Sequence, residues 1–371
     1  DIELRMQNYY NKKREIVGDN GKLIDFANGH HYFGFHKVEN GWFFREWAPA
    51  AHEIYLMGDF NGWDRWSHRM NNLGNGIFEI FIEGREALWD DCRVKVIIKH
   101  WEKFLERIPS YCKRVLQNPY DYTWCGAVVD EPEYIWQKNN FKPQKKLFIY
   151  ETHIGMAQER EGVGTYKEFK ENILPRIKDL GYNAIQLMAI AEHPYYGSFG
   201  YHVSNFFAAS SRFGTPEDLK DLIDTAHEMG MKVIMDLVHS HTVKNTYEGL
   251  NLFDGTEDQY LVGGHAGYHQ QWDSKLFNYG KIETLRFLLS NVRYWLEEYH
   301  FDGFRFDGVT SMLYHHHGIG VEFGKQEDYF GDNVNNDAVT YLQLANTLIH
   351  QLNEDNITIA EDVSGMPGIC A

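Results

Sequence analysis

Hydrophobic and polar positions follow two different patterns along this chain, and the change comes near Leu147. In the earlier part, runs of aromatic and β-branched residues, which favour β-strands, are separated by turns rich in Gly and Asn. The runs lie at 41–47, 53–57, 77–82 and 93–99. Short strands joined by such turns predict a small β-sandwich of ~100 residues. On either side we expect a polar helix or tether over 1–25 and an irregular connection over 101–145.

After Leu147, apolar runs alternate with segments of helical periodicity. The apolar runs are 147–150, 184–190, 232–237, 301–306 and 357–360, and the helical segments are 168–180, 216–229, 283–299 and 337–352. In the third helical segment one apolar stripe comprises Leu285, Leu288, Leu289, Val292 and Trp295. Gly181 and Gly230 stand where left-handed helix caps are expected. The alternation predicts a parallel sheet of five strands with crossover helices.

Five parallel strands can belong to an open nucleotide-binding sheet or to an eight-stranded barrel. The segment after the first strand carries no Gly-rich phosphate loop, which disfavours the open sheet. Polar residues gather instead where the strands end, the face on which barrel enzymes carry their active sites. They are Glu151, Asp236, His239, His241, Arg305, Asp307, Glu361 and Asp362. The predicted fold is therefore multidomain, with a β-sandwich followed by an incomplete (β/α)8 TIM barrel of five strand-helix units.

Charge and composition argue against several classes of function. The 371 residues include 36 Lys and Arg against 53 Asp and Glu, and the net charge of −17 repels nucleic acid. No segment approaches the ~18 uncharged apolar residues of a membrane span. The four cysteines show no metal or disulfide spacing, which favours a reducing, cytoplasmic location. The chain starts at Asp1 without an initiator Met or signal segment, so we expect its start to be cropped.

Two carboxyl groups in opposed surroundings indicate glycoside chemistry. Asp307 lies at the end of an apolar strand, and Arg305, two residues earlier on the same face, is expected to keep it ionised as a nucleophile requires. Glu361 ends another apolar strand, where partial desolvation would raise its pKa, as a proton donor requires. A separation of ~5–5.5 Å between the two carboxyls would support retaining cleavage.

Three segments resemble signature segments of the α-amylase superfamily: 236–241 (DLVHSH), 303–307 (GFRFD) and 360–362 (AED). Within it the chain is most similar to the eukaryotic-type 1,4-α-glucan (glycogen or starch) branching enzymes, and the similarity covers nearly the whole chain. Branching-enzyme likeness is carried by 191–196, 199–201, 208–216, 307–318 and 361–366, and likeness to a glycogen-binding-type module by 47–49 and 58–63.

The resemblance implies a role for each site residue. Asp307 would be the nucleophile, Glu361 the acid/base and Arg305 the group that holds the nucleophile. Around the transferred sugar, Tyr201 would stack on the ring while Asp236 and His241 complete the shell. Amylases with a structural calcium usually have Asn before the histidine that corresponds to His241, whereas this chain has Ser240. We therefore expect no such calcium, no other metal and no cofactor.

The fourth signature segment, a His-Asp pair, is absent before the chain stops at Ala371, so the carboxylate triad is expected to be incomplete in this sequence. The run 315–317 (HHH) is predicted to be loop structure near the acceptor side rather than a metal site, since three consecutive side chains cannot easily face one ion. Trp63 is a candidate glucan-stacking residue on the sandwich.

We predict three parts: an N-terminal segment 1–25, a carbohydrate-binding-type sandwich 26–130 and the catalytic barrel 131–371. The predicted activity is 1,4-α-glucan branching by a monomer, with glycogen or another α-1,4-glucan as partner and neither nucleic acid nor membrane. Two alternatives stay open. One is an α-glucan hydrolase of amylase or debranching type, in which water is the acceptor, and the other is a non-catalytic glucan-binding protein.

Overall fold

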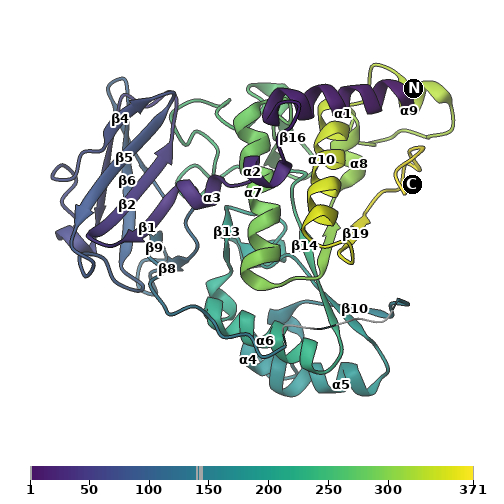
Figure 1. The fold of residues 1–371 in the computed structure, drawn as a ribbon, viewed down its shortest axis with the longest axis horizontal. Helices are drawn as coiled ribbons and strands as arrows, with labels where there is room; N and C mark the ends of the chain where they lie inside the picture. Colours follow the sequence, from purple (N-terminus) through teal and green to yellow (C-terminus); the bar gives the residue numbers. More distant parts are fainter. Residues whose placement is uncertain (1, 139–140, 142–144, 371) are drawn as a thin grey trace.

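The fold was analysed in a computed structural model, which describes residues 2–138, 141 and 145–370. The chain begins with helix α1 (Ile2–Val17), followed by two short helices, α2 (Leu23–Phe26) and α3 (Gly29–Tyr32). Helix α1 packs across α10 (Asn336–Leu352), far from it in sequence (Figure 1), and Tyr9 Oη donates to Thr347 Oγ1 at 3.1 Å. The polar segment expected at the N-terminus is thus a helix packed on the C-terminal part of the chain.

Two antiparallel sheets form the predicted sandwich. The first has the order β1-β2-β5-β4 and the second β3-β6-β9-β8, with β7 also paired to β6. Their bounds are Gly34–Val38 (β1), Gly41–Trp47 (β2), Glu53–Gly58 (β3), Asn71–Gly74 (β4), Ile77–Glu83 (β5), Arg93–His100 (β6), Lys103–Arg107 (β7), Val115–Gln117 (β8) and Trp124–Ala127 (β9). Alternate residues of β5 are buried, as expected for a strand with one face on a core. The core between the sheets includes Trp42, Phe44, Leu56, Phe78 and Val96.

The prediction of an irregular connection over 101–145 is wrong for its first part, because β7, β8 and β9 lie within it. The β6–β7 hairpin turns at Trp101-Glu102, where Trp101 has φ +53°. Two-residue hairpin turns are usually marked by Asn-Gly or Asp-Gly, so this turn had no recognisable signal. From residue 128 to 148 the described residues contain no helix or strand. There, the Asp224 carboxylate accepts from Gln137 N at 2.9 Å and holds the connection against α6 (Pro216–Glu228).

The five predicted strands form one parallel sheet in chain order. They are β10 (Ile149–Thr152), β11 (Ala184–Leu187), β14 (Lys232–Leu237), β18 (Gly303–Phe306) and β19 (Ile357–Ala360). The register sets Asp236 beside Arg305 and Phe306 beside Ala360. Because parallel strands end on the same edge of a sheet, the residues at and just beyond these ends are brought together.

The predicted helices are found within two residues of their expected ends, apart from a π-helical stretch in the first. That segment comprises α4 (Tyr166–Glu168), the π-helix η3 (Phe169–Ile173) and α5 (Leu174–Asp179). Helix α6 begins with a capping box between Thr215 and Asp218. In α7 (Ile282–Tyr299) the predicted apolar stripe is buried. Gly181 and Gly230 have φ +93° and +77°, which confirms the left-handed caps.

The remaining elements are short and lie in the segments that connect the sheet strands and helices. They are η1 (Asp59–Asn61), η2 (Ile154–Met156), β12 (Ala191–Glu192), η4 (Tyr196–Ser198), β13 (Asn205–Ala209), η5 (Ser211–Phe213), β15 (Thr242–Val243), η6 (His265–Gly267), β16 (Tyr268–His269), β17 (Ser274–Lys275), α8 (Val309–Leu313) and α9 (Gln326–Phe330). Over the described part of the chain, no helix combines the length and apolar character needed to cross a membrane.

Direct hydrogen bonds join the sandwich to the segment between β15 and η6. The Gln259 side chain donates to the Trp47 carbonyl at 2.7 Å, and Ala50 N donates to Asp254 Oδ2 at 3.0 Å. Arg107 donates to the Leu252 carbonyl at 2.7 Å. These contacts fix the sandwich beside the parallel-sheet part, as Figure 1 shows.

Candidate active site

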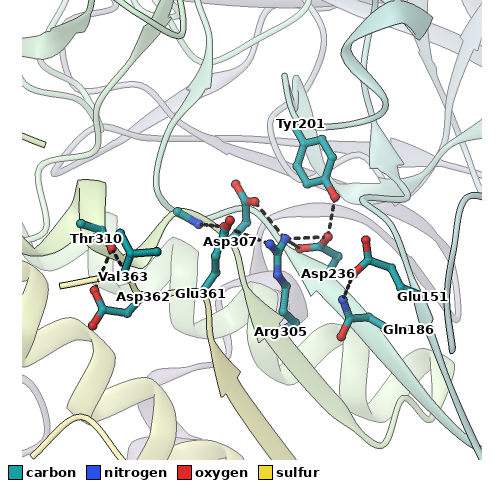
Figure 2. A network of polar contacts seen from close by, with 11 residues as sticks. Glu151, Gln186, Tyr201, Asp236, Arg305, Asp307, Thr310, Glu361, Asp362 and Val363 are labelled. Atoms are coloured by element: carbon teal, nitrogen blue, oxygen red, sulfur yellow. Dashed lines mark hydrogen bonds and ion pairs between the residues drawn. The ribbon is translucent and has the colours of Figure 1, made fainter. Parts of the chain in front are cut away.

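The carboxyl ends of β14, β18 and β19 bring together four charged residues that the sequence had singled out: Asp236, Arg305, Asp307 and Glu361 (Figure 2). The Arg305 guanidinium lies at their centre. Its Nη1 donates to both oxygens of Asp236 at 2.9 Å and to Asp307 Oδ1 at 3.0 Å, while Nη2 lies 3.0 Å from Glu361 Oε2. The predicted contact between Arg305 and Asp307 is present, and the same cation contacts two further carboxylates.

Asp236 is the most enclosed of these acids, with 1% of the residue exposed. Burial raises its pKa to about 6, against the opposing effects of Arg305 and of a hydrogen bond from Tyr201. Tyr201 Oη donates to Asp236 Oδ2 at 2.7 Å. The tyrosine is thereby fixed over the end of β14, with its ring beside the cluster (Figure 2).

The electrostatics of the two proposed catalytic carboxyls differ from our prediction. Burial raises the pKa of Asp307 to about 8, and the nearby charges of Asp236 and Glu361 add to this, so Arg305 does not hold Asp307 ionised as expected. The reason is that one guanidinium is shared among three acids, two of which repel a charge on Asp307. Glu361 was expected to be desolvated, yet 46% of its side chain is exposed, and Gly308 N donates to its Oε2 at 2.8 Å.

Asp307 and Glu361 share the Arg305 guanidinium, Asp307 through Nη1 and Glu361 through Nη2. Two neighbouring carboxyls in different surroundings, one enclosed and one half exposed, can act as nucleophile and proton donor, which is the requirement for acid-assisted displacement at a sugar carbon.

A cavity of about 660 Å³ opens above the cluster. Its lining comprises Ser198, Tyr201, His202, His241, Gln271, Trp272, Asp273, Arg305, Asp307 and Glu361. His241 is buried, with Nδ1 2.6 Å from Ser274 Oγ. Burial and the neighbouring imidazoles of His202 and His269 lower the pKa of His241 to about 3. At neutral pH it is therefore an uncharged group that can exchange hydrogen bonds with hydroxyls.

Some residues from the predicted strand-end set lie away from this cavity. His239 contacts the Tyr341 hydroxyl and lies 2.9 Å from Asn291 Oδ1, within the core. Asp362 accepts from Thr310 Oγ1 at 2.7 Å, on the far side of β19 from the cluster (Figure 2). Glu151 accepts from Gln186 at 2.8 Å and is outside the cavity lining.

Trp63 belongs to the sandwich and is also outside the cavity lining. It follows η1, its Nε1 donates to Asp59 Oδ1 at 2.9 Å, and 37% of the residue is exposed. The histidine run 315–317 lies in the loop after α8, as predicted, and the His317 ring is 4.7 Å from that of His269.

Sequence reasoning missed the loop residues of the cavity, above all Trp272 and His202. The Trp272 ring stacks on His269 with 4.2 Å between centroids and 7° between planes. The His202 ring lies 5.7 Å from that of His241. Neither residue is at a strand end, so the rule that found the carboxylates could not find them. The one available signal was a tryptophan in a polar loop, 270–273 (QQWD).

Comparison with known proteins gives matches in both parts of the chain. The model of the α-amylase catalytic domain matches residues 155–259, and that of carbohydrate-binding module 48 (isoamylase N-terminal domain) matches residues 32–120. Among solved structures, the pullulanase from Bacillus acidopullulyticus has a TM-score of 0.69 at 20% identity over 89% of this chain and 41% of its own. That similarity is one of fold.

Curated relatives named 1,4-alpha-glucan-branching enzyme match almost the whole chain. The protein from Aspergillus oryzae is 52% identical over 94% of this chain and 52% of its own length. The protein from Dictyostelium discoideum is 47% identical over 100% of this chain and 55% of its own. The chain thus spans about half the length of these relatives. The resemblance inferred from the sequence motifs is confirmed.

Proposed function

Since the chain belongs to the branching-enzyme family of the α-amylase superfamily, we propose that it carries the catalytic carboxyl pair of a 1,4-α-glucan-branching enzyme. The complete protein would cut an α-1,4-linked glucan and join the released chain to a glucosyl 6-hydroxyl, giving an α-1,6 branch. The observation that carries this proposal is the Arg305 guanidinium, which holds Asp307 and Glu361 side by side in one cavity.

The reaction we propose has two displacements. Asp307 attacks the anomeric carbon while Glu361 gives its proton to the glycosidic oxygen, so that the bond from that carbon to the leaving oxygen breaks and a glycosyl-enzyme ester forms. A 6-hydroxyl of an acceptor glucan then attacks the same carbon, gives its proton to Glu361 and releases Asp307. Configuration is retained. The contact of both carboxyls with one guanidinium, each at 3.0 Å, supports a close pair over inversion, which needs carboxyls ~6.5–9.5 Å apart.

Binding of substrate would prepare the site for this reaction. In the free site, burial and the neighbouring acids raise the pKa of Asp307 to about 8. A glucan bound between the carboxyls would separate Asp307 from Glu361 and leave Asp307 as an anion beside Arg305. The raised pKa of Asp307 in the free site is thereby reconciled with its proposed role as nucleophile.

The residues around the pair would bind the transferred sugar. Tyr201 would stack on the ring, held by its hydrogen bond to Asp236. His241, uncharged at neutral pH, would hydrogen-bond ring hydroxyls. Arg305 would position the carboxyls rather than contact the substrate first, because its donors are already occupied by acids.

For the whole chain we propose three parts, 1–25, 26–130 and 131–371, in which the parallel strands are the first five of a (β/α)8 barrel. The sandwich would bind glucan through exposed aromatic residues, including Trp63. Its match to a carbohydrate-binding module supports this role. We further propose a cytoplasmic monomer that acts on glycogen or another α-1,4-glucan.

Product linkage tests the proposal against its alternatives. The complete enzyme is incubated with linear amylose, and α-1,6 linkages and new reducing ends are counted before and after enzymatic debranching. Branching produces α-1,6 linkages with almost no net gain of reducing ends. A gain of reducing ends without α-1,6 linkages would identify a hydrolase, and an unchanged glucan would identify a binding protein.

A further inference from the structure

Two neighbouring histidines and a glutamate lie close together where the start of the sandwich packs against helix α7. His30 and His31 lie on α3, directly before β1, and Glu297 lies in the last turn of α7. The Gly29 N–H donates to Ser290 Oγ of α7 at 2.9 Å. A side chain at Gly29 would come within 2.8 Å of the Tyr111 hydroxyl. The backbone of α3 is therefore packed closely against Tyr111 and held to α7 by the hydrogen bond to Ser290.

One ligand atom from each of His30, His31 and Glu297 lies within 4.8 Å of the other two. Ligand atoms around a single zinc ion are ~3–3.5 Å apart, given bond lengths of ~2.0–2.2 Å. Small side-chain rotations would therefore bring the three ligand atoms to this spacing. His31 and Glu297 are exposed, which leaves a path for an ion from solvent. This geometry is independent of the carboxylate cluster of the candidate active site.

The second observation is a ring nitrogen of His30 that has no hydrogen-bond partner. The residue is 4% exposed, and its Nδ1 is buried with no hydrogen-bond partner in the described chain. A buried polar nitrogen normally has a partner, because desolvation without one is costly. An unpartnered imidazole nitrogen is a free ligand position, and imidazole is among the commonest metal ligands in proteins.

We propose that His30, His31 and Glu297 form a binding site for a divalent transition-metal ion, with zinc as the preferred occupant. Two imidazole nitrogens and one carboxylate oxygen are a ligand set that suits zinc, whereas calcium and magnesium prefer oxygen ligands. Three protein ligands leave a fourth position for water. The ion would tie α3, and with it the first strand of the sandwich, to the end of α7.

Positive charge near the three proposed ligands limits their affinity for a metal cation. Arg293 Nε donates to Glu297 Oε1 at 2.9 Å, and Lys113 also acts on the histidines electrostatically. The metal must therefore share Glu297 with Arg293, most simply by binding the other carboxylate oxygen. We expect micromolar rather than nanomolar binding. We predicted no metal from the strand ends and the run 315–317, and a pair of adjacent histidines in a short N-terminal helix has no recognised metal-ligand spacing.

Calorimetric titration of zinc into the chelator-treated chain tests the proposal. We expect one equivalent to bind with a micromolar Kd and to raise the Tm. The variants His31→Asn and Glu297→Gln change exposed residues and should fold. Each is expected to weaken binding of that equivalent by at least about tenfold and to remove the zinc-dependent rise in Tm. His265→Asn alters an exposed histidine outside the cluster and should bind zinc like the unchanged chain.

Cobalt provides a spectroscopic measurement on the same proteins. Cobalt(II) in a four-coordinate site with nitrogen and oxygen ligands should give visible absorption bands that saturate at one equivalent and are lost in His31→Asn. No saturable binding of either ion would overturn the proposal. Unchanged binding in both His31→Asn and Glu297→Gln would overturn it as well, because the ion would then lie elsewhere.

Discussion

Arg305 donates from one guanidinium nitrogen to both oxygens of Asp236, each at 2.9 Å, across two neighbouring strands. The two residues are register partners in the parallel sheet, Asp236 on β14 and Arg305 on β18. This pairing aims the remaining donors of Arg305 along the sheet edge toward Asp307 and Glu361. The position of Asp307 and Glu361 thus depends on the contact between Asp236 and Arg305.

The first prediction follows from that geometry. Lysine carries one ammonium group and cannot contact three carboxylates as the planar guanidinium does. We expect Arg305→Lys in the complete enzyme to lower kcat about 100-fold, with a smaller change in KM, because the carboxyls lose their alignment while the cavity remains. Arg286→Lys is the matched control, since Arg286 pairs with Glu283 on the surface of α7. Retention of more than half the activity by Arg305→Lys would contradict the positioning role.

The raised pKa of Asp307 predicts how stability depends on pH. Its pKa rises from 3.8 to about 8 on folding, so the folded chain binds a proton more tightly than the unfolded chain, and this contribution to stability is lost as pH rises from about 4 to 8. Asp307→Asn cannot titrate. We expect its Tm to exceed that of the unchanged chain by an amount that grows steadily as the pH rises through this window. A difference in Tm that does not vary with pH would show that Asp307 titrates normally.

The role of Glu361 as proton donor is tested by changing the leaving group of the donor substrate. In Glu361→Gln the glycosidic oxygen receives no proton, so turnover of amylose should fall about 10³-fold. Fluoride departs from a glycosyl fluoride without a proton, so with this donor we expect the first step, measured as the burst of fluoride release, to recover to within about tenfold of the unchanged enzyme. The second step, in which Glu361 accepts the proton of the acceptor, should stay slow. Asp307→Asn serves as the control, because loss of the nucleophile should abolish turnover of both donors. Equal losses of Glu361→Gln on amylose and on fluorides would rule out its role as the acid.

The sheet and the carboxylate cluster were predictable because they depend on local pattern. Four of the five sheet strands are apolar runs with polar residues at or just beyond their ends, and parallel strands bring such ends together. The raised pKa of Asp307 and the 46% exposure of Glu361 were not predictable in the same way. They depend on burial in the folded chain and on how many acids share Arg305, and the neighbouring residues in the sequence do not reveal either.

Loops and turns account for the rest of what the sequence did not predict. The β6–β7 hairpin turns at Trp101-Glu102 without a turn residue, and Trp272 reaches the cavity from a loop whose path depends on its stacking against His269. The contact between α1 and α10 joins Tyr9 to Thr347, residues far apart in the chain. Such long-range contacts leave no periodic signal.

The last prediction concerns glucan binding by the sandwich. Trp63 is 37% exposed, and its Nε1 is held by Asp59, so its ring is fixed and available for stacking on a sugar. We expect Trp63→Ala to reduce the retardation of the chain in glycogen-containing gels, with an apparent affinity loss of about 1–2 kcal/mol. Trp89→Ala is the matched control, because Trp89 is 45% exposed on the same module but lies outside the two segments, 47–49 and 58–63, whose motifs resemble the glycogen-binding-type module. Equal retardation of both variants and the unchanged chain would place the glucan surface elsewhere on the sandwich. Equal losses in the two variants would instead indicate a general effect of exposed tryptophans, and only a selective loss in Trp63→Ala supports a defined site.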